Sequence, residues 1–594
     1  MTIAAGDALE RVRPWHELPT ALGLVCLLGI RTRLRFHNLY DPAPGGDGDG
    51  AGTARPPAGG AGAPFGRNQP LWDAPRGDDG LLDPSPREIS RRLLARDGRM
   101  AEVPFLNLLA AAWLQFMVHD WMSHATDRTD RIHVRLADDD DWRVRAPGGA
   151  MVVPRTRPGA SGGRPGGPPV FDNTETHWWD GSQVYGSTPE LQSRVRSGEG
   201  GRLRLDPDGT LPMDGDRGIE LAGVNGNWWM GLSLLHTLFA REHNAICAML
   251  AARHPDWDDE RLFRTARRIN AAAMAKIHTI EWTPAVLPHP TTRAAMLGNW
   301  HGLLGPCRGR LARRLIRWDV LTGIPGSRHD DHGVPYALTE EFVAVYRMHP
   351  LIPDEFRMVS ADDGRELGRR TMLEVTGTSA REAARGFRIE DLVASFAVGR
   401  PGMLALHNYP DTLRDLPRGR SDEDGSERRI DVAAIDILRD RERGVPRYND
   451  FRRMLRLAPA AGFEELTGGD AETARELREV YGDVERVDLM VGLYAEPLLA
   501  GFGFSETAFR IFVLMASRRL KSDPAFTDDY RPEVYTREGL RWVERATMRS
   551  VIARHLPALA PLSDDVRNAF APWDRPSNRR SGATTPFAPA VSEP

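Results

Sequence analysis

The sequence predicts a mostly α-helical protein with one large core built of many helices. Apolar residues recur with helical periodicity over long stretches, whereas alternating strand patterns are confined to short runs such as 133–138 and 150–154. The 594 residues carry a formal charge of -4 and 41% of them are hydrophobic, a globular composition without the basic excess typical of nucleic-acid binding. The predicted helices cover residues 103–125, 228–254, 258–282, 337–349, 388–406, 469–482 and 503–521.

Two stretches rich in Gly, Pro and Ala, 41–66 and 155–169, contain too few apolar residues to fold and are expected to be surface loops. We expect residues 1–90 to form an N-terminal helix and loop that pack on the core. Residues 91–571 then form the main domain, and residues 572–594 form a flexible tail.

The apolar run at 18–30 is shorter than the ~20 residues that span a bilayer. A packed helix is the favoured interpretation, and a peripheral membrane contact, helped by the basic flank at 31–35, is the alternative. Few, scattered cysteines and no secretory pattern favour a reducing, cytoplasmic location. We expect a monomer.

The helix predicted at 103–125 carries two polar side chains on one face, Gln115 and His119, because residues four apart share a helical face. They are either satisfied core groups or the lining of a buried polar site. Asp120 projects in another direction, and a buried carboxylate needs a cation. Residues 176–182 offer closely spaced hard oxygens, the ligands that calcium takes, although the spacing alone favours an ordinary turn.

Tyr346 and His349 stand three residues apart in a segment that we predict to be helical up to Pro350. A neutral histidine can ligate haem iron, and a phenol on the same helical face would then lie beside the macrocycle and could carry a radical. The alternative is a packed tyrosine with a histidine at the helix end, where the helix dipole favours it. The spacing alone favours this alternative.

Five segments in one order resemble the animal-type haem peroxidase superfamily, which includes the cyclooxygenases. The similarity runs from about residue 90 to 570, and within the superfamily it is greatest to the fatty-acid α-dioxygenases of plants and bacteria. The resemblance implies a large multi-helix catalytic domain with few short strands. The segments are "LQFMVHDW" (114–121), "WWDGSQVYG" (178–186), "LLHTLFAREHN" (234–244), "YRMHPLIPD" (346–354) and "DVAAIDILRDRERGVPRYNDFRR" (431–453).

The resemblance implies a role for each matching residue. His349 matches the proximal ligand of the haem iron, Tyr346 the radical tyrosine, and His119 the distal histidine with Gln115 as its neighbour. We expect Asn408 to hydrogen bond to His349 from behind. The implied cofactors are non-covalent haem b and calcium, and the residues that match the calcium site are Asp120, Thr176, Trp178 (through its carbonyl), Asp180 and Ser182.

Three departures from the true peroxidases favour an oxygenase. Met348 stands where peroxidases usually have Gly before the proximal histidine, and Tyr346 has no counterpart there. Val118 replaces the acid that esterifies the haem, so the haem should be held non-covalently at that point. Asn225 lies near the position of the distal Arg, without which splitting of a peroxide bond should be slower.

A carboxylate pocket is implied by His278, Thr283 and Arg519, which match the corresponding residues of the α-dioxygenases. Arginine binds carboxylate through two charge-assisted hydrogen bonds, and the other two side chains can donate further bonds. Taken alone, Arg519 would be interpreted as a solvated charge at a helix end. The apolar residues 508–517 before it are suited to wall an acyl chain.

The expected function is therefore fatty-acid α-dioxygenation, with a fatty acid and O2 as substrates. The resemblance implies that a radical on Tyr346 removes a hydrogen atom from C2 and that O2 then adds there, which gives a 2-hydroperoxy acid. The alternatives are a haem peroxidase that uses hydrogen peroxide, a dioxygenase that attacks an internal carbon of an unsaturated acid, and a non-enzymatic haem-binding module.

Overall fold

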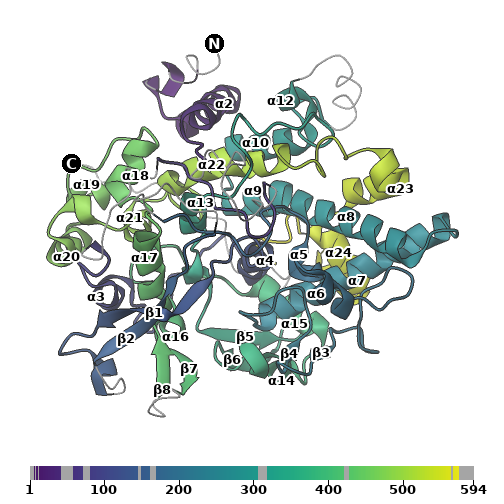
Figure 1. Cartoon of the computed structure of the whole chain (residues 1–594), viewed down its shortest axis with the longest axis horizontal. Coiled ribbons are helices and arrows are strands. Elements are labelled where there is room, and N and C mark those ends of the chain that lie inside the picture. Colours follow the sequence, from purple (N-terminus) through teal and green to yellow (C-terminus); the bar gives the residue numbers. More distant parts are fainter. Residues whose placement is uncertain are drawn as a thin grey trace.

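The computed structural model describes residues 6, 8–10, 12–41, 58–70, 80–144, 149–160, 169–305, 318–420, 427–563 and 566–573. Helices dominate these residues, and the strands form only short pairs at the periphery, as predicted (Figure 1). The predicted tail after residue 573 lies outside the described residues. So do positions 42–57 and 161–168 of the two predicted loops.

Three long helices form the centre of the molecule: α4 (Leu108–Val118), α7 (Met230–Arg253) and α8 (Asp259–Ile277). Helix α7 packs against both of the others, and α23 (Pro532–Arg545) covers α8. Helix α4 begins where the Asn107 side chain accepts a hydrogen bond from the Ala110 amide at 3.2 Å. Nearly every residue of α4 is buried, because its apolar side chains surround the whole helix.

A second group of helices lies above this centre (Figure 1). Helix α22 (Glu506–Lys521) packs against α13 (Glu340–Val345) on one side and α2 (Thr20–His37) on the other, and α2 also contacts α10 (Pro290–His301). The run predicted as a packed helix at 18–30 is thus part of α2. Within the described part of the chain, no helix is both long and apolar enough to span a membrane.

All strand pairs are two-stranded and antiparallel. The two predicted strands are found as β1 (Thr126–Arg135) and β2 (Ala150–Thr156), which pair with each other. The other strands are β3 (Met213–Asp214), β4 (Ile219–Glu220), β5 (Glu355–Val359), β6 (Glu366–Thr371), β7 (Leu416–Arg420) and β8 (Glu427–Ile430).

The remaining helices are shorter. They are η1 (Trp15–Glu17), α3 (Pro86–Ile89), η4 (Ser90–Leu94), η5 (Asp141–Val144), α5 (Ser182–Tyr185), α6 (Pro189–Val195), η6 (His278–Trp282), α9 (Thr283–Val286), α12 (Asp319–Thr322), η7 (His349–Leu351), η8 (Gly377–Ser379), α14 (Ala380–Ala384), α15 (Ile389–Val398), α16 (Asp411–Arg414), α17 (Val432–Glu442), α18 (Tyr448–Met454), α19 (Phe463–Leu466), α20 (Ala471–Tyr481), η9 (Val484–Arg486), α21 (Leu489–Ala495), α24 (Met548–His555), η10 (Pro557–Leu559) and α25 (Ala560–Ser563).

Three predicted helices are too long. The helix predicted at 103–125 is confined to α4, Leu108–Val118. Proline explains the other two errors. The helix predicted at 337–349 ends with α13 at Val345, because Pro350 has no N–H for the carbonyl four residues earlier and its ring would clash there. The helix predicted at 388–406 ends with α15 at Val398, three residues before Pro401.

One hydrophobic cluster joins the ends of the chain to its centre. It contains Trp15 and Ile30 from the N-terminal segment, Leu109 of α4, and Phe570 near the C-terminus. The N-terminal segment therefore packs on the same core as the central helices.

Candidate functional site

Tyr346 and His349 do not lie on one helical face, contrary to the prediction. Tyr346 follows the last residue of α13, with φ -90° and ψ 8°, and His349 opens the separate short helix η7 after Met348. The turn between them lets the two side chains enter different surroundings.

The Tyr346 ring is buried among aromatic side chains. Its centroid lies 4.4 Å from that of Phe342, 6.1 Å from that of Trp121 and 6.4 Å from that of Phe512. Burial raises the pKa of the phenol well above its ordinary value. The hydroxyl therefore keeps its hydrogen at neutral pH.

Tyr346 lines a small cavity together with the three residues predicted to bind a carboxylate. His278, Thr283 and Arg519 all contribute to the wall, although they come from η6, α9 and α22. The structure thus brings the predicted carboxylate pocket beside the predicted radical tyrosine. The other lining residues include Trp121, Trp179, Met296, Asn299, Phe342, Phe512 and Ala516.

Arg519 is a buried cation, not a solvated surface charge. Its side chain donates from Nε to the Tyr336 hydroxyl at 3.1 Å and from Nη2 to the His177 carbonyl at 3.0 Å, and Nη1 has no partner. The guanidinium carbon lies 3.6 Å from the ring centroid of Trp121. No carboxylate of the described residues forms an ion pair with it, so the cavity offers an uncompensated positive charge.

The bonds of His278 fix where its proton lies. The Trp113 indole can only donate, so its 3.3 Å contact makes Nδ1 of His278 the acceptor and leaves the proton on Nε2. Burial, and then the charge of Arg519, lower the pKa of His278 to about 3, so the ring is neutral. The Thr283 hydroxyl donates to the His278 carbonyl at 2.8 Å, which leaves its oxygen as an acceptor.

His349 is held from behind by a carboxylate. Its Nδ1 lies 2.7 Å from Oδ2 of Asp436, which also accepts from the Tyr409 hydroxyl at 2.9 Å. Burial acts to raise the pKa of Asp436, but its interactions with His349 and Arg347 outweigh burial and hold that pKa at about 2. Asp436 is therefore ionised and accepts the Nδ1 proton, which leaves Nε2 available to a metal.

The predicted contact from Asn408 to His349 is wrong. The Asn408 amide donates to the carbonyls of Ala101 and Met403, at 2.9 and 2.8 Å, and its oxygen accepts from the Ala101 amide. Asp436 takes the role instead. The sequence signal was a pair of carboxylates, Asp436 and Asp440, on the buried helix α17, where each needs a cation.

A second polar group surrounds His119 at the end of α4. Its Nδ1 lies 3.1 Å from Oδ1 of Asn227, and its Nε2 lies 3.2 Å from Nε2 of His236. Gln115, one turn earlier, accepts a hydrogen bond from Trp229 at 2.7 Å. Desolvation lowers the pKa of His119 to about 4, so the ring is neutral.

Asn225 does not lie against His119, as its predicted place near the distal arginine position would require. Its Oδ1 accepts from Arg217 at 2.7 Å and its Nδ2 donates to the Glu220 carbonyl. Asn227, two residues later, makes the contact with His119. Sequence reasoning missed Asn227 and His236, which carry no charge pattern to distinguish them.

The residues predicted to bind calcium retain unused oxygens. Asp120 accepts on Oδ2 from the Ser182 hydroxyl at 2.6 Å, and its Oδ1 is buried without a partner. The Thr176 hydroxyl is also buried without a partner, whereas Asp180 is bound by Arg267 at 3.1 Å. Burial raises the pKa of Asp120 to about 8.

A larger apolar cavity adjoins the one at Tyr346. It has a volume of about 270 Å³ and lies between α2, α10 and α22. Four residues, Met296, Asn299, Phe512 and Ala516, line both cavities. The two cavities therefore lie side by side and share part of their walls.

Comparison with known proteins shows the family of this chain. The family model described as animal haem peroxidase matches residues 46–567. Alpha-dioxygenase 2 of Arabidopsis thaliana is 39% identical over 96% of this chain and 93% of its own. The crystal structure of Oryza sativa fatty acid alpha-dioxygenase is 36% identical, with a TM-score of 0.86 and 97% of each chain covered. A tyrosine-to-phenylalanine variant of that protein, solved with palmitic acid, matches equally. The chain belongs to the animal haem peroxidase family and, within it, to the α-dioxygenases.

Proposed function

We propose that this protein is a haem-dependent fatty-acid α-dioxygenase. The observation that carries the proposal is the shared cavity, where the Tyr346 phenol and the unpaired guanidinium of Arg519 line the same wall. A carboxylate held by Arg519 and by Nε2–H of His278 would bring its adjoining carbon to the phenol.

The described residues are suited to haem. His349 presents Nε2 while Asp436 holds Nδ1, and 38% of the His349 side chain is exposed, which leaves room for an iron ligand sphere. Val118 carries no group that could esterify the haem, so we propose non-covalent binding. Bound haem supplies the oxidising equivalent that turns the Tyr346 phenol into a radical. Neutral His119 would be able to accept a proton from a hydroperoxide.

In the reaction, the Tyr346 radical removes one hydrogen atom from C2, which breaks a C–H bond and forms the phenol O–H. O2 adds to the C2 radical, and the resulting peroxyl group takes the hydrogen back from Tyr346. The radical is restored and the product is a 2-hydroperoxy acid. Loss of carbon dioxide and water, as the O–O and C1–C2 bonds break, converts this product into an aldehyde one carbon shorter.

We also propose that Asp120, Thr176, the Trp178 carbonyl, Asp180 and Ser182 hold calcium. The support is the pair of buried, unpartnered oxygens on Asp120 and Thr176. A cation there would compensate the buried carboxylate and would accept oxygen ligands of this kind.

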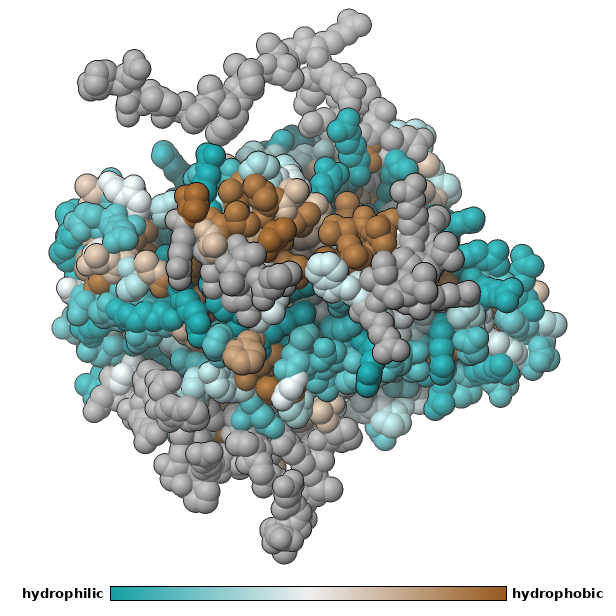
Figure 2. Space-filling view, turned by 90° about the horizontal axis from the view of Figure 1, so that it is seen from above, coloured by the Kyte–Doolittle hydropathy of each residue, from teal (hydrophilic) through white to brown (hydrophobic). Residues whose placement is uncertain are grey.

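A membrane contact is the third proposal. Leu22, Val25, Leu297, Leu303, Leu304 and Trp318 each keep between 37% and 51% of their surface exposed. They belong to α2, α10 and the chain beside α12, and apolar residues gather on this face (Figure 2). Because the apolar cavity lies between the same elements, a membrane could deliver the acid to it.

Oxygen uptake with palmitate tests the proposed function. We expect the haem-loaded protein to produce the 2-hydroperoxide or the shorter aldehyde, and Tyr346→Phe to abolish both while the Soret band stays unchanged, because only the phenol hydrogen is lost. Tyr40→Phe, whose hydroxyl contacts only a surface carbonyl, is the control. Full oxygenation by Tyr346→Phe would exclude the radical role.

A further inference from the structure

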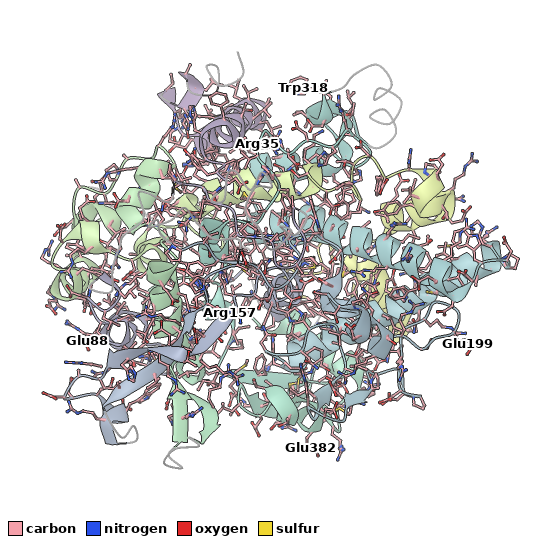
Figure 3. All side chains as sticks on the ribbon, in the orientation of Figure 1. Arg35, Glu88, Arg157, Glu199, Trp318 and Glu382 are labelled. Atoms are coloured by element: carbon pink, nitrogen blue, oxygen red, sulfur yellow. The ribbon has the colours of Figure 1, made fainter. Side chains whose placement is uncertain are left out.

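The apolar cavity contains an unexpected positive charge. Arg31 of α2 lines it, and its Nη1 donates to Oδ1 of Asn299 at 3.0 Å. One turn later, Arg35 donates from Nη2 to the hydroxyl of Ser517, another lining residue, at 2.7 Å, and its Nε is buried without a partner. Arg35 lies beneath α2, on the side of the molecule that also carries Trp318 (Figure 3).

Neither arginine is neutralised by an ion pair with a described residue. Their hydrogen-bond partners, Asn299 and Ser517, are neutral. Desolvation by burial lowers the pKa of both guanidinium groups, although the charge of Asp319 acts on both in the opposite direction. Two cations without an ion-pair partner are costly to the fold beside an apolar cavity. The position of the two arginines is explained if an anion binds transiently to this wall of the apolar cavity.

Arg31 lies beside the wall that the two cavities share. Its partner Asn299 lines the apolar cavity and the Tyr346 cavity alike. Val25, six residues before Arg31 on α2, is 39% exposed and also lines the apolar cavity. A molecule that enters beside Val25 and moves towards Tyr346 therefore passes the guanidinium of Arg31.

An ionised carboxylate loses its hydration when it crosses an apolar cavity, and this raises the barrier to binding. A cation part of the way along the path lowers that barrier and increases the rate of capture. Arg519 cannot do this, because it lies at the end of the path.

We infer that Arg31, supported by Arg35, is a transient carboxylate site, which binds the headgroup of the incoming fatty acid before it reaches Arg519. This inference rests on the proposed function. The acid enters carboxylate first, and its acyl chain follows into the apolar cavity between α2, α10 and α22.

Steady-state oxygen uptake with palmitate, by the haem-loaded protein, tests the inference. Arg31→Gln lowers kcat/KM roughly tenfold, because kcat/KM reports capture, and leaves kcat within about twofold. Arg31→Lys, which keeps the charge, restores most of kcat/KM. The kcat/KM of the wild type falls with added salt, whereas that of Arg31→Gln changes little.

Arg293→Gln is the matched control, since this exposed arginine of α10 does not line the cavity. Arg35→Gln is a second variant, which removes the supporting charge one turn away, outside the wall of the Tyr346 cavity, and should lower kcat/KM even if Arg31→Gln folds poorly. If the Arg31→Gln and Arg35→Gln variants behave like Arg293→Gln, or if kcat and kcat/KM fall together, the inference is wrong. Failure of the wild type to oxygenate palmitate would instead overturn the proposed function.

Discussion

At the scale of single residues, two buried charges define the site, and they differ in whether neighbouring groups neutralise them. Asp436 is buried but fully compensated by His349, Arg347 and the Tyr409 hydroxyl. Arg519 is buried and lacks any such anion among the described residues. Asp436 therefore holds His349, the proposed iron ligand, in a fixed orientation. The charge of Arg519 is neutralised only when an anion such as a carboxylate binds.

Removing the charge of Arg519 should weaken carboxylate binding. Because hydrogen bonds to charged groups contribute about 1.5–3 kcal/mol, Arg519→Gln should raise KM for palmitate roughly 10- to 100-fold and broaden the position of oxygen attack. Product analysis after palmitate oxygenation measures both effects. Arg518→Gln is the control, because Arg518 binds backbone carbonyls of residues 334 and 335 and should affect stability alone. An unchanged KM with unchanged products would exclude the carboxylate role.

Removing the charge of Asp436 should loosen the haem. Asp436→Asn leaves the fold with a similar side chain but deprives His349 of its anionic partner, so we expect roughly 10- to 100-fold weaker haem retention. The rate of haem transfer to an apo-globin measures it. Asp440→Asn on the same helix, which loses a bond to Arg347 without touching His349, should retain haem normally. Equal haem loss in the two variants would argue for a general effect of α17.

At the scale of elements, the site depends on helix ends. Helix α13 stops before Tyr346 and η7 starts at His349, so the phenol lies in the aromatic cavity while the imidazole turns to α17. Helix α4 likewise ends at Val118, which places Asp120 in a turn where it meets Ser182 of α5. Each helix end therefore lets two residues that are close in sequence point into two different sites.

Calcium binding to the turn after α4 should depend on pH. The raised pKa of Asp120, about 8, means that without a cation it is protonated at neutral pH. Calcium must displace that proton, so its affinity should increase as pH rises, roughly 100-fold between about pH 6 and pH 9. Calorimetric titration at several pH values measures this. Asp120→Asn should abolish binding, whereas Asp130→Asn on β1 should not; pH-independent binding would contradict the proposed ligand.

At the scale of the whole molecule, the N-terminal helix α2 forms part of the cavity wall, although α2 is far in sequence from the other residues of the site. Helix α2 closes the apolar cavity against α10 and α22, and α22 carries both the cavity wall and Arg519. The apolar face of Figure 2 lies on the outer side of α2, α10 and the chain beside α12. One layer of helices thus separates the outer surface from the catalytic cavity.

The apolar face should bind lipid vesicles. We expect the protein to sediment with phosphatidylcholine vesicles, and Leu304→Glu combined with Trp318→Glu to reduce this strongly, because two charges would have to enter the interface. Leu373→Glu is the control, since Leu373 is 48% exposed but follows β6. Equal sedimentation of all three proteins would exclude the membrane contact.

The sequence by itself determined the fold class, the main helices and most of the residues that meet in the site. Periodicity located α7, α8, α20 and α22, because their apolar faces are continuous over several turns. Segment resemblance brought Tyr346, His278, Thr283 and Arg519 into one expected pocket, and the structure places them around one cavity.

Only the tertiary structure decided which partner each polar group finds. Asp436 rather than Asn408 reaches His349, and Asn227 rather than Asn225 reaches His119, because such contacts join elements far apart in the chain. The burial of Arg519 likewise could not be predicted from the sequence, since its own segment has the composition of a solvated helix end. Local patterns report how a segment folds, whereas burial and charge compensation depend on the segments that pack against it.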